Sequence, residues 1–210
     1  MPWNKDDLRI GGFGQLPENV DATGRMIRNT APPVPRRKGE RQPPAPAHKP
    51  ETISPTRKGN EILDFIGKLE SSDNYNIIYG NEEKPLTTMT LKKVQKLQKE
   101  MIDEGRGSSA VGRYQFRRNT LKEAADKLGV DESALFDKKL QDQLARARME
   151  YRGFEKYKAG KISTEALIKN LSDEWAALPP DPSNKSRYEG ILNNRALTDY
   201  QTVKDLLEKK

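Results

Sequence analysis

The sequence contains no cysteine and only one histidine, His48, which lies in a proline-rich stretch. Without cysteine the chain can form no disulfide framework and carry out no thiolate chemistry. A single histidine argues against a multi-histidine metal site and against a Ser-His-Asp triad, so we expect no metal and no cofactor. Any chemistry must therefore rest on carboxylates, hydroxyls or amides.

Long apolar runs are also missing from the sequence. No stretch approaches the roughly 20 apolar residues that cross a bilayer, so we expect no membrane span. Residues 1–30 lack the apolar core of a secretory signal. We therefore expect that a substrate outside the cytoplasm is reached by another route.

Positive charge is concentrated near the N-terminus. The chain has a formal charge of +7, and residues 1–59 hold 11 Lys and Arg against 6 Asp and Glu, a net of +5. Residues 60–210 hold the remaining 27 against 25, a net of +2. A basic segment suits anionic partners such as nucleic acid, membrane or cell wall, and charge alone does not choose among them.

Residues 1–59 differ in composition from the rest and are predicted to form an extended arm. They hold 10 of the 14 prolines, and residues 31–55 should be polyproline-II-like and unfolded in isolation. Spaced hydrophobic residues precede this stretch: Trp3, Leu8, Ile10, Phe13 and Leu16. They suggest a peptide that docks on a partner, and the alternative is a disordered tail with incidental hydrophobic residues.

Residues 60–210 carry helical periodicity and are long enough to bury a core. The expected helices begin at Asn60, Thr90, Thr120, Asp131, Ser163 or Thr164, and Thr198. Residues 75–88 predict a short strand-rich excursion with Gly80-Asn81 at its turn. The predicted fold is a predominantly helical α+β domain with a small β-hairpin, preceded by the extended arm.

Glu70 is the first candidate for chemistry. It ends the predicted first helix and precedes the polar residues 71–74. A carboxylate near a helix C-terminus faces the negative end of the helix dipole, and burial would hold its proton more tightly still. A general acid needs that property, although a solvated glutamate in a last helical turn is the alternative.

Two further segments combine small, aromatic and amide side chains. In residues 107–116 (GSSAVGRYQF) small residues allow close backbone approach to a ligand, and a tyrosine and a glutamine can grip a sugar. The alternative is a flexible loop. Residues 175–180 (WAALPP) begin with Trp175, which we expect in the core. Tyr188 lies further on, in a polar loop that could face a cleft.

Together these motifs resemble the phage lambda-type lysozyme, or endolysin lytic transglycosylase, family over about residues 60–195. The resemblance rests on Glu-Ser-Ser-Asp-Asn at 70–74, Gly-Arg-Tyr-Gln at 112–115 and Trp-Ala-Ala-Leu-Pro at 175–179, in that order. It implies a lysozyme-like fold and cleavage of the β-1,4 bond between N-acetylmuramic acid and N-acetylglucosamine. It also implies Glu70 as the acid of a lytic transglycosylase, which forms a 1,6-anhydro product without water.

The resemblance further implies a set of substrate contacts. They are Ser71, Asp73, Tyr79, Ser109, Arg113, Tyr114, Gln115 and Tyr188. We expect Asp73 to have a structural role. Hydrolysis with Asp73 as the second carboxylate stays open, because a two-carboxylate glycosidase needs a defined separation between its acids.

The arm suggests where such an enzyme works. We expect residues 1–59 to bind other virion proteins and to tether the enzyme to a phage tail or baseplate, where it opens the host wall. One alternative is a free endolysin held in the host cytoplasm before lysis, and another is a catalytically inactive structural adaptor. Nucleic-acid binding through residues 36–41 is disfavoured, because no interleaved aromatics or recognition module accompany the charges.

Overall fold

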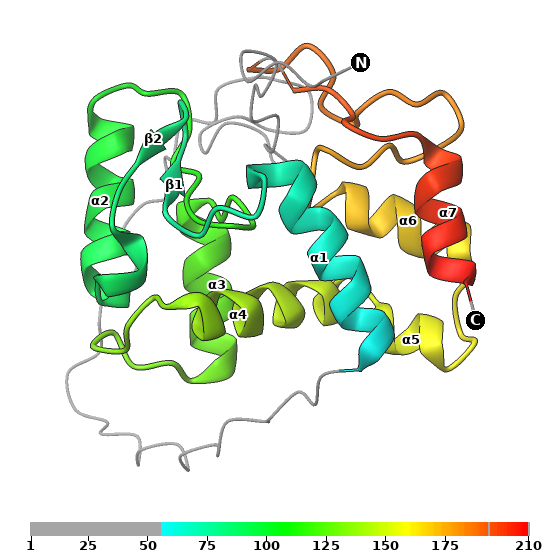
Figure 1. Ribbon diagram of the computed structural model, residues 1–210, viewed down its shortest axis with the longest axis horizontal. Helices are drawn as coiled ribbons and strands as arrows, with labels where there is room; N and C mark the ends of the chain where they lie inside the picture. Colours follow the sequence, from blue (N-terminus) through cyan, green and yellow to red (C-terminus); the bar gives the residue numbers. More distant parts are fainter. Residues whose placement is uncertain (1–55, 193, 210) are drawn as a thin grey trace, which may run out of the picture.

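The computed structural model describes residues 56–192 and 194–209 (Figure 1). In chain order the elements are α1 (Arg57–Ser71), β1 (Ile77–Ile78), β2 (Glu82–Glu83), a 3-10 helix η2 (Leu86–Thr88), α2 (Leu91–Asp103), α3 (Arg118–Leu128), α4 (Lys138–Tyr151), α5 (Phe154–Lys158), α6 (Thr164–Ser172) and α7 (Tyr200–Glu208). The predicted helical α+β class with a small hairpin is confirmed for these residues. Residues 1–55, which make up nearly all of the predicted arm, lie outside them.

The helices divide into two groups with α1 between them (Figure 1). The hairpin and α2 lie on one side of the molecule, and α6 and α7 lie on the other. Helices α3 and α4 pack on each other, and α4 also packs on α1. The C-terminal end of α1 therefore lies where the two groups meet.

Several predicted helix ends are confirmed. Thr90 caps α2 by accepting a hydrogen bond from the N–H of Lys93, and Ser163 caps α6 in the same way. Gly129 ends α3 in the left-handed conformation with φ of 62°. These signals are local, so the sequence carries them without knowledge of the tertiary structure.

Three predicted helix starts are wrong. Helix α1 begins at Arg57 with Thr56 as its cap, rather than at Asn60. Helix α3 begins at Arg118 rather than Thr120. The helix predicted from Asp131 begins at Lys138, because residues 134–136 pair with the segment around Thr90 instead of continuing a helix.

The hairpin is shorter than the predicted excursion but has the predicted turn. Ile77 pairs with Glu83 and Ile78 with Glu82 in antiparallel register. Gly80 and Asn81 both take positive φ, 89° and 63°, which a tight turn requires. Ile78 also bridges to Val111, so the hairpin holds the loop that follows α2.

One apolar core joins the helices. Among its fully buried large side chains are Leu63, Ile66, Leu121, Phe136 and Phe154. Trp175 is buried as expected, although it lies three residues beyond the end of α6. Within residues 56–209, position 193 aside, no helix combines the length and apolar character that crossing a membrane requires.

Candidate active site

Glu70 is a buried carboxyl group at the end of α1. It is the penultimate residue of α1 and is 1% exposed. Both carboxylate oxygens lack a hydrogen-bond partner in the part of the chain that the structure describes. Native proteins rarely leave a buried polar group unsatisfied, and such a group is often functional.

Burial raises the pKa of Glu70 well above its ordinary value, because the charged form loses its hydration. The backbone N–H of Ala177 lowers the pKa by a smaller amount. That N–H is near enough to act on the charge but does not form a hydrogen bond of normal geometry with either oxygen. Glu70 therefore keeps its proton to a higher pH than a solvated glutamate does.

The chain leaves α1 through a strained turn directly after Glu70. Ser72 and Asp73 have φ of 53° and 63°, in the left-handed region that non-glycine residues seldom adopt. Their N–H groups bond to the carbonyl oxygens of Lys68 and Gly67, each at 3.1 Å. Each non-glycine residue in the left-handed conformation costs on the order of 1–3 kcal/mol, so contacts with the surrounding structure must hold this turn in place.

Arg113 contacts this turn through both its side chain and its backbone. Its Nε and Nη2 donate to Asp73 Oδ1 at 3.0 and 2.6 Å, and Nη2 also donates to Asp64 Oδ1 at 2.9 Å. Its Nη1 donates to the Tyr114 hydroxyl at 2.7 Å, and its carbonyl oxygen accepts from Ser71 Oγ at 2.9 Å. The guanidinium lies over Gly67, where an added Cβ would be 2.5 Å from Nε.

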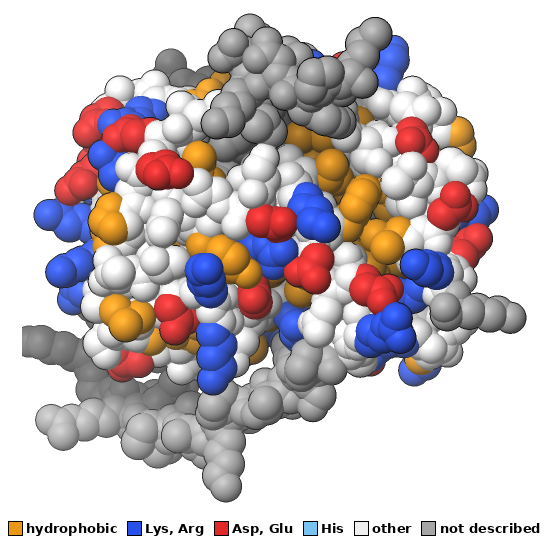
Figure 2. Space-filling model, viewed as in Figure 1, with side chains coloured by type: hydrophobic (Ala, Val, Ile, Leu, Met, Phe, Trp, Pro, Cys, Tyr) orange, Lys and Arg blue, Asp and Glu red, His pale blue; other side chains and the backbone are white. Residues whose placement is uncertain are grey.

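The Arg113 network continues onto α4 through Asp142. Asp142 Oδ1 accepts from the hydroxyls of Tyr75 and Tyr114 at 2.9 and 2.8 Å. Burial, together with the hydrogen bond to Asp142, raises the pKa of Tyr75 to about 12, so it stays a donor. Figure 2 shows acidic and basic side chains interspersed over the face formed by α1 and α4.

The structure thus brings four of the predicted contacts together: Ser71, Asp73, Arg113 and Tyr114. Each has a side-chain hydrogen bond to another part of the protein. Their predicted contact with substrate stays a prediction, while their structural contacts are established by the hydrogen bonds.

Two buried glutamines that the sequence reasoning missed hold the loop before α3. Gln98 of α2 donates to the carbonyl oxygens of Ser109 and Phe116 at 2.9 and 2.8 Å. Gln141 of α4 accepts from the Arg113 N–H at 3.0 Å. An available signal was the place of Gln98 one turn after Val94, on the apolar side of a helix.

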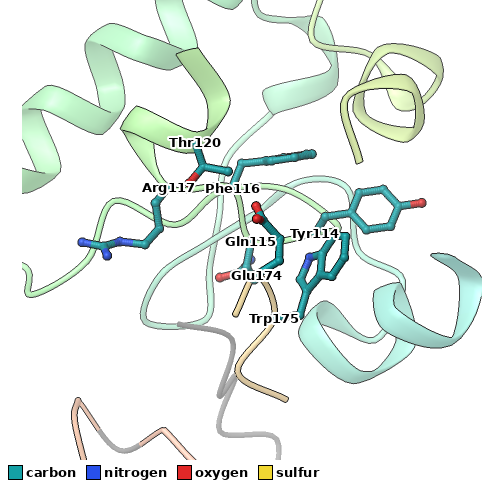
Figure 3. A pocket seen from close by; sticks show the side chains of 7 residues that line it. All are labelled: Tyr114, Gln115, Phe116, Arg117, Thr120, Glu174 and Trp175. Carbon is teal, nitrogen blue, oxygen red and sulfur yellow. The ribbon is translucent and has the colours of Figure 1, made fainter. Parts of the chain in front are cut away.

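This loop presents Gln115 in a pocket beside the 173–179 segment. Gln115 has φ of 49°, and its Nε2 donates to the Gly112 carbonyl at 2.9 Å. Its Oε1 is buried and has no hydrogen-bond partner among the described residues. In Figure 3 the side chains of Gln115, Glu174 and Trp175 gather at the centre of the pocket, and that of Arg117 points away from them.

A buried ion-pair cluster fixes the segment that carries Trp175 and Ala177. Glu174, 3% exposed at its side chain, accepts from Arg148 Nε and Nη2 at 2.8 and 2.9 Å and from Arg152 Nε at 2.7 Å. Such paired, charge-assisted bonds are strong and directional. They fix the segment whose Ala177 N–H faces Glu70.

The other predicted contacts lie apart from the Arg113 network. Tyr79 is partly buried and lies beside Gly107, where an added Cβ would be 3.6 Å from the tyrosine hydroxyl. Ser109 is buried, and its Oγ accepts from the Arg118 N–H at 3.1 Å. Tyr188 is partly buried, and its hydroxyl donates to the Asp173 carbonyl at 3.1 Å.

Comparison with known proteins gives one family. The family model described as Endolysin matches residues 60–202, which include all the residues above. No match was found among the curated proteins or among the solved structures.

Proposed function

Since the chain belongs to the endolysin family, as the match over residues 60–202 shows, we propose that it cuts peptidoglycan glycan strands with Glu70 as its acid. Family membership makes the chain a phage enzyme that degrades peptidoglycan and confirms the resemblance predicted from its motifs. The observation that supports Glu70 is its buried carboxyl group, which has no hydrogen-bond partner among the described residues and a raised pKa. Such a group keeps its proton to a higher pH than a solvated glutamate does and can give it to a leaving oxygen.

We further propose the lytic transglycosylase reaction between N-acetylmuramic acid and N-acetylglucosamine. Glu70 donates its proton to the glycosidic oxygen as the C1–O bond breaks. The 6-hydroxyl of the N-acetylmuramic acid then bonds to C1, and the Glu70 carboxylate takes up the hydroxyl proton. The products are a free 4-hydroxyl and a 1,6-anhydro ring, and Glu70 ends protonated as it began.

The position of Asp73 favours this reaction over hydrolysis. Asp73 is the carboxylate nearest to Glu70 in the sequence after it, and Arg113 binds it at 2.6 and 3.0 Å. Because these bonds hold the carboxylate on Arg113, it is poorly placed to activate water or to act as a nucleophile. One free carboxyl group is sufficient for the transglycosylase reaction.

Gln115 is the best supported of the proposed substrate contacts. Its Oε1 has no hydrogen-bond partner in the described part of the chain and is buried, so a sugar hydroxyl or amide N–H reaches it only if the side chains around the pocket move. Tyr79, Ser109 and Tyr188 are proposed as further contacts.

The test is digestion of purified peptidoglycan, with products identified by mass spectrometry. Wild-type protein should release anhydro-muropeptides, and Glu70→Gln should release none. Glu61→Gln is the matched control, because Glu61 lies on the same helix and pairs with the exposed Arg57. Reducing-end products from wild type would instead indicate a hydrolase, and no products from wild type would favour an inactive adaptor.

For residues 1–59 we propose a tether to the phage tail or baseplate. The basic, proline-rich composition and the spaced anchors Trp3, Ile10 and Phe13 support an arm that binds other virion proteins. Deleting residues 1–55, which leaves α1 and its cap intact, should preserve activity on purified wall and remove the protein from particles. Full-length protein absent from purified virions would favour a free endolysin that acts from the host cytoplasm at lysis.

A further inference from the structure

We infer that Arg113 is a positioning residue for Glu70, fixing the C-terminal end of α1 through Asp73 and Ser71. This inference rests on the proposed catalytic role of Glu70. It gives Arg113 a different task from the substrate contact that the family motif implies.

The contacts of Arg113 surround Glu70 in the sequence. Asp64 lies six residues before Glu70, Ser71 directly follows it and Asp73 lies three residues after it. The guanidinium bonds to both aspartates at 2.6 to 3.0 Å, and the backbone oxygen accepts from Ser71. One residue therefore ties together the helix before the acid and the turn after it.

The turn needs this support because its backbone is strained. Ser72 and Asp73 both occupy the left-handed region without being glycine. Strain of this kind persists where surrounding contacts over-determine the conformation. The Arg113–Asp73 bonds are charge-assisted, and they join a buried guanidinium, 8% exposed, to a carboxylate that is 40% exposed.

Two further features show that the position is built for a guanidinium. Gly67 leaves the space that Arg113 Nε and Cζ occupy, at 2.5 and 2.9 Å from an added Cβ. The rings of Tyr75 and Tyr114 both lie 5.2 Å from Cζ, at cation–π distance. Lysine keeps the charge but lacks the planar fork that reaches Asp64, Asp73 and Tyr114 together.

The test compares full-length wild type, Arg113→Lys and Asp73→Asn on a soluble glycan-strand substrate. Both variants should lose kcat by about 100-fold, as expected for a misplaced catalytic group, while KM changes by less than about threefold. The double variant should lose little more than either single one, because both substitutions disrupt the same Arg113–Asp73 ion pair. The upper limb of the kcat pH profile should also move to lower pH, because a loosened α1 terminus admits water to Glu70.

Two controls separate positioning from other causes. Val203→Ala removes core volume from α7 and should lower Tm while leaving kcat, KM and the pH limb unchanged. If Arg113→Lys folds poorly, Ser71→Ala is measured in its place. It removes the hydrogen bond from Ser71 to the Arg113 carbonyl oxygen and should also lower kcat.

Three outcomes overturn the inference. A raised KM with unchanged kcat and pH limb assigns Arg113 to substrate contact. A lower Tm alone, as in Val203→Ala, leaves Arg113 a purely structural role. Full activity in Glu70→Gln removes the proposed function itself and this inference with it, whereas inactive Glu70→Gln beside fully active Arg113→Lys removes only the inference.

Discussion

Replacing Glu70 by Gln is expected to stabilise the protein at alkaline pH while abolishing its activity. The carboxyl group is 1% exposed, and neither oxygen has a hydrogen-bond partner in the described part of the chain. A buried group left unsatisfied costs about 1–3 kcal/mol, and more when it is charged. Removing the charge should recover about 1–3 kcal/mol, or roughly 3–9 °C in Tm for a domain of this size.

The sign of the pH dependence follows from the raised pKa of Glu70. Folding binds the proton more tightly, so the folded state loses stability as pH rises from the unfolded-state pKa to the folded-state pKa. The loss is complete above the folded-state pKa and absent below the unfolded-state value. The Tm gain of Glu70→Gln, measured from about pH 4 to about pH 9, should therefore be near zero at the acid end and increase as the pH rises.

The assay is thermal unfolding by circular dichroism across this pH range, with Glu174→Gln as the matched control. Glu174 is almost as buried but is paired with Arg148 and Arg152. Glu174→Gln removes the buried carboxylate from that cluster and leaves Arg148 with Glu123 as its remaining ion-pair partner, which should cost about 3 kcal/mol at neutral pH. A Tm difference for Glu70→Gln that does not change with pH would refute the account of Glu70 as a desolvated acid.

Three other substitutions test the surroundings of the site. Gly67→Ala should lower both activity and Tm, because contact with Arg113 costs about 1–3 kcal/mol, more than the helix gain of about 1 kcal/mol; a higher Tm would contradict the packing. Gln98→Leu strips buried carbonyls of their donor and should cost about 2 kcal/mol in denaturant unfolding, whereas an unchanged midpoint would contradict the predicted role. Burial, and next the charge of Glu155, raise the pKa of Glu150 to about 7, so Glu150→Gln should raise Tm at about pH 8 and not at about pH 4; equal shifts would argue against that pKa.

Local signals in the sequence were sufficient for much of the fold. Thr90, Ser163 and Gly129 mark helix ends through bonds or backbone conformations within a few residues of themselves. The start of α1 was not predictable in this way. Thr56 and Asn60 are both good caps, and the choice between them depends on contacts of the first turn with the rest of the protein.

Helix α5 was missed for a different reason. It spans five residues, Phe154–Lys158, between Gly153 and Ala159, which is too short to show helical periodicity. Its existence depends on packing against α4 and α6, as the contacts between these helices indicate. Periodic patterns therefore identified the long helices and missed the connecting one.

Some features of the candidate site were predictable from local sequence, and others were not. The place of Glu70 at the end of a helix was predictable from its apolar stripe. Its burial was not, because Ala177 comes from a segment more than 100 residues away in the sequence. The engagement of Arg113 with Asp64, Asp73 and Asp142 likewise arises only when α1, the loop before α3 and α4 meet.

Glu70 and Glu174 are both buried glutamates with different neighbours. They show that the tertiary surroundings of a residue, rather than its type, decide its role. Both are buried, and residue type alone does not distinguish them. Glu174 meets two arginines and becomes a structural anchor. Glu70 is approached by the Ala177 amide, while the guanidinium of Arg113 is bound to Asp64 and Asp73. By binding Asp73 and Asp64, Arg113 holds the helix end without neutralising Glu70, so the acid is fixed in place and still keeps its proton.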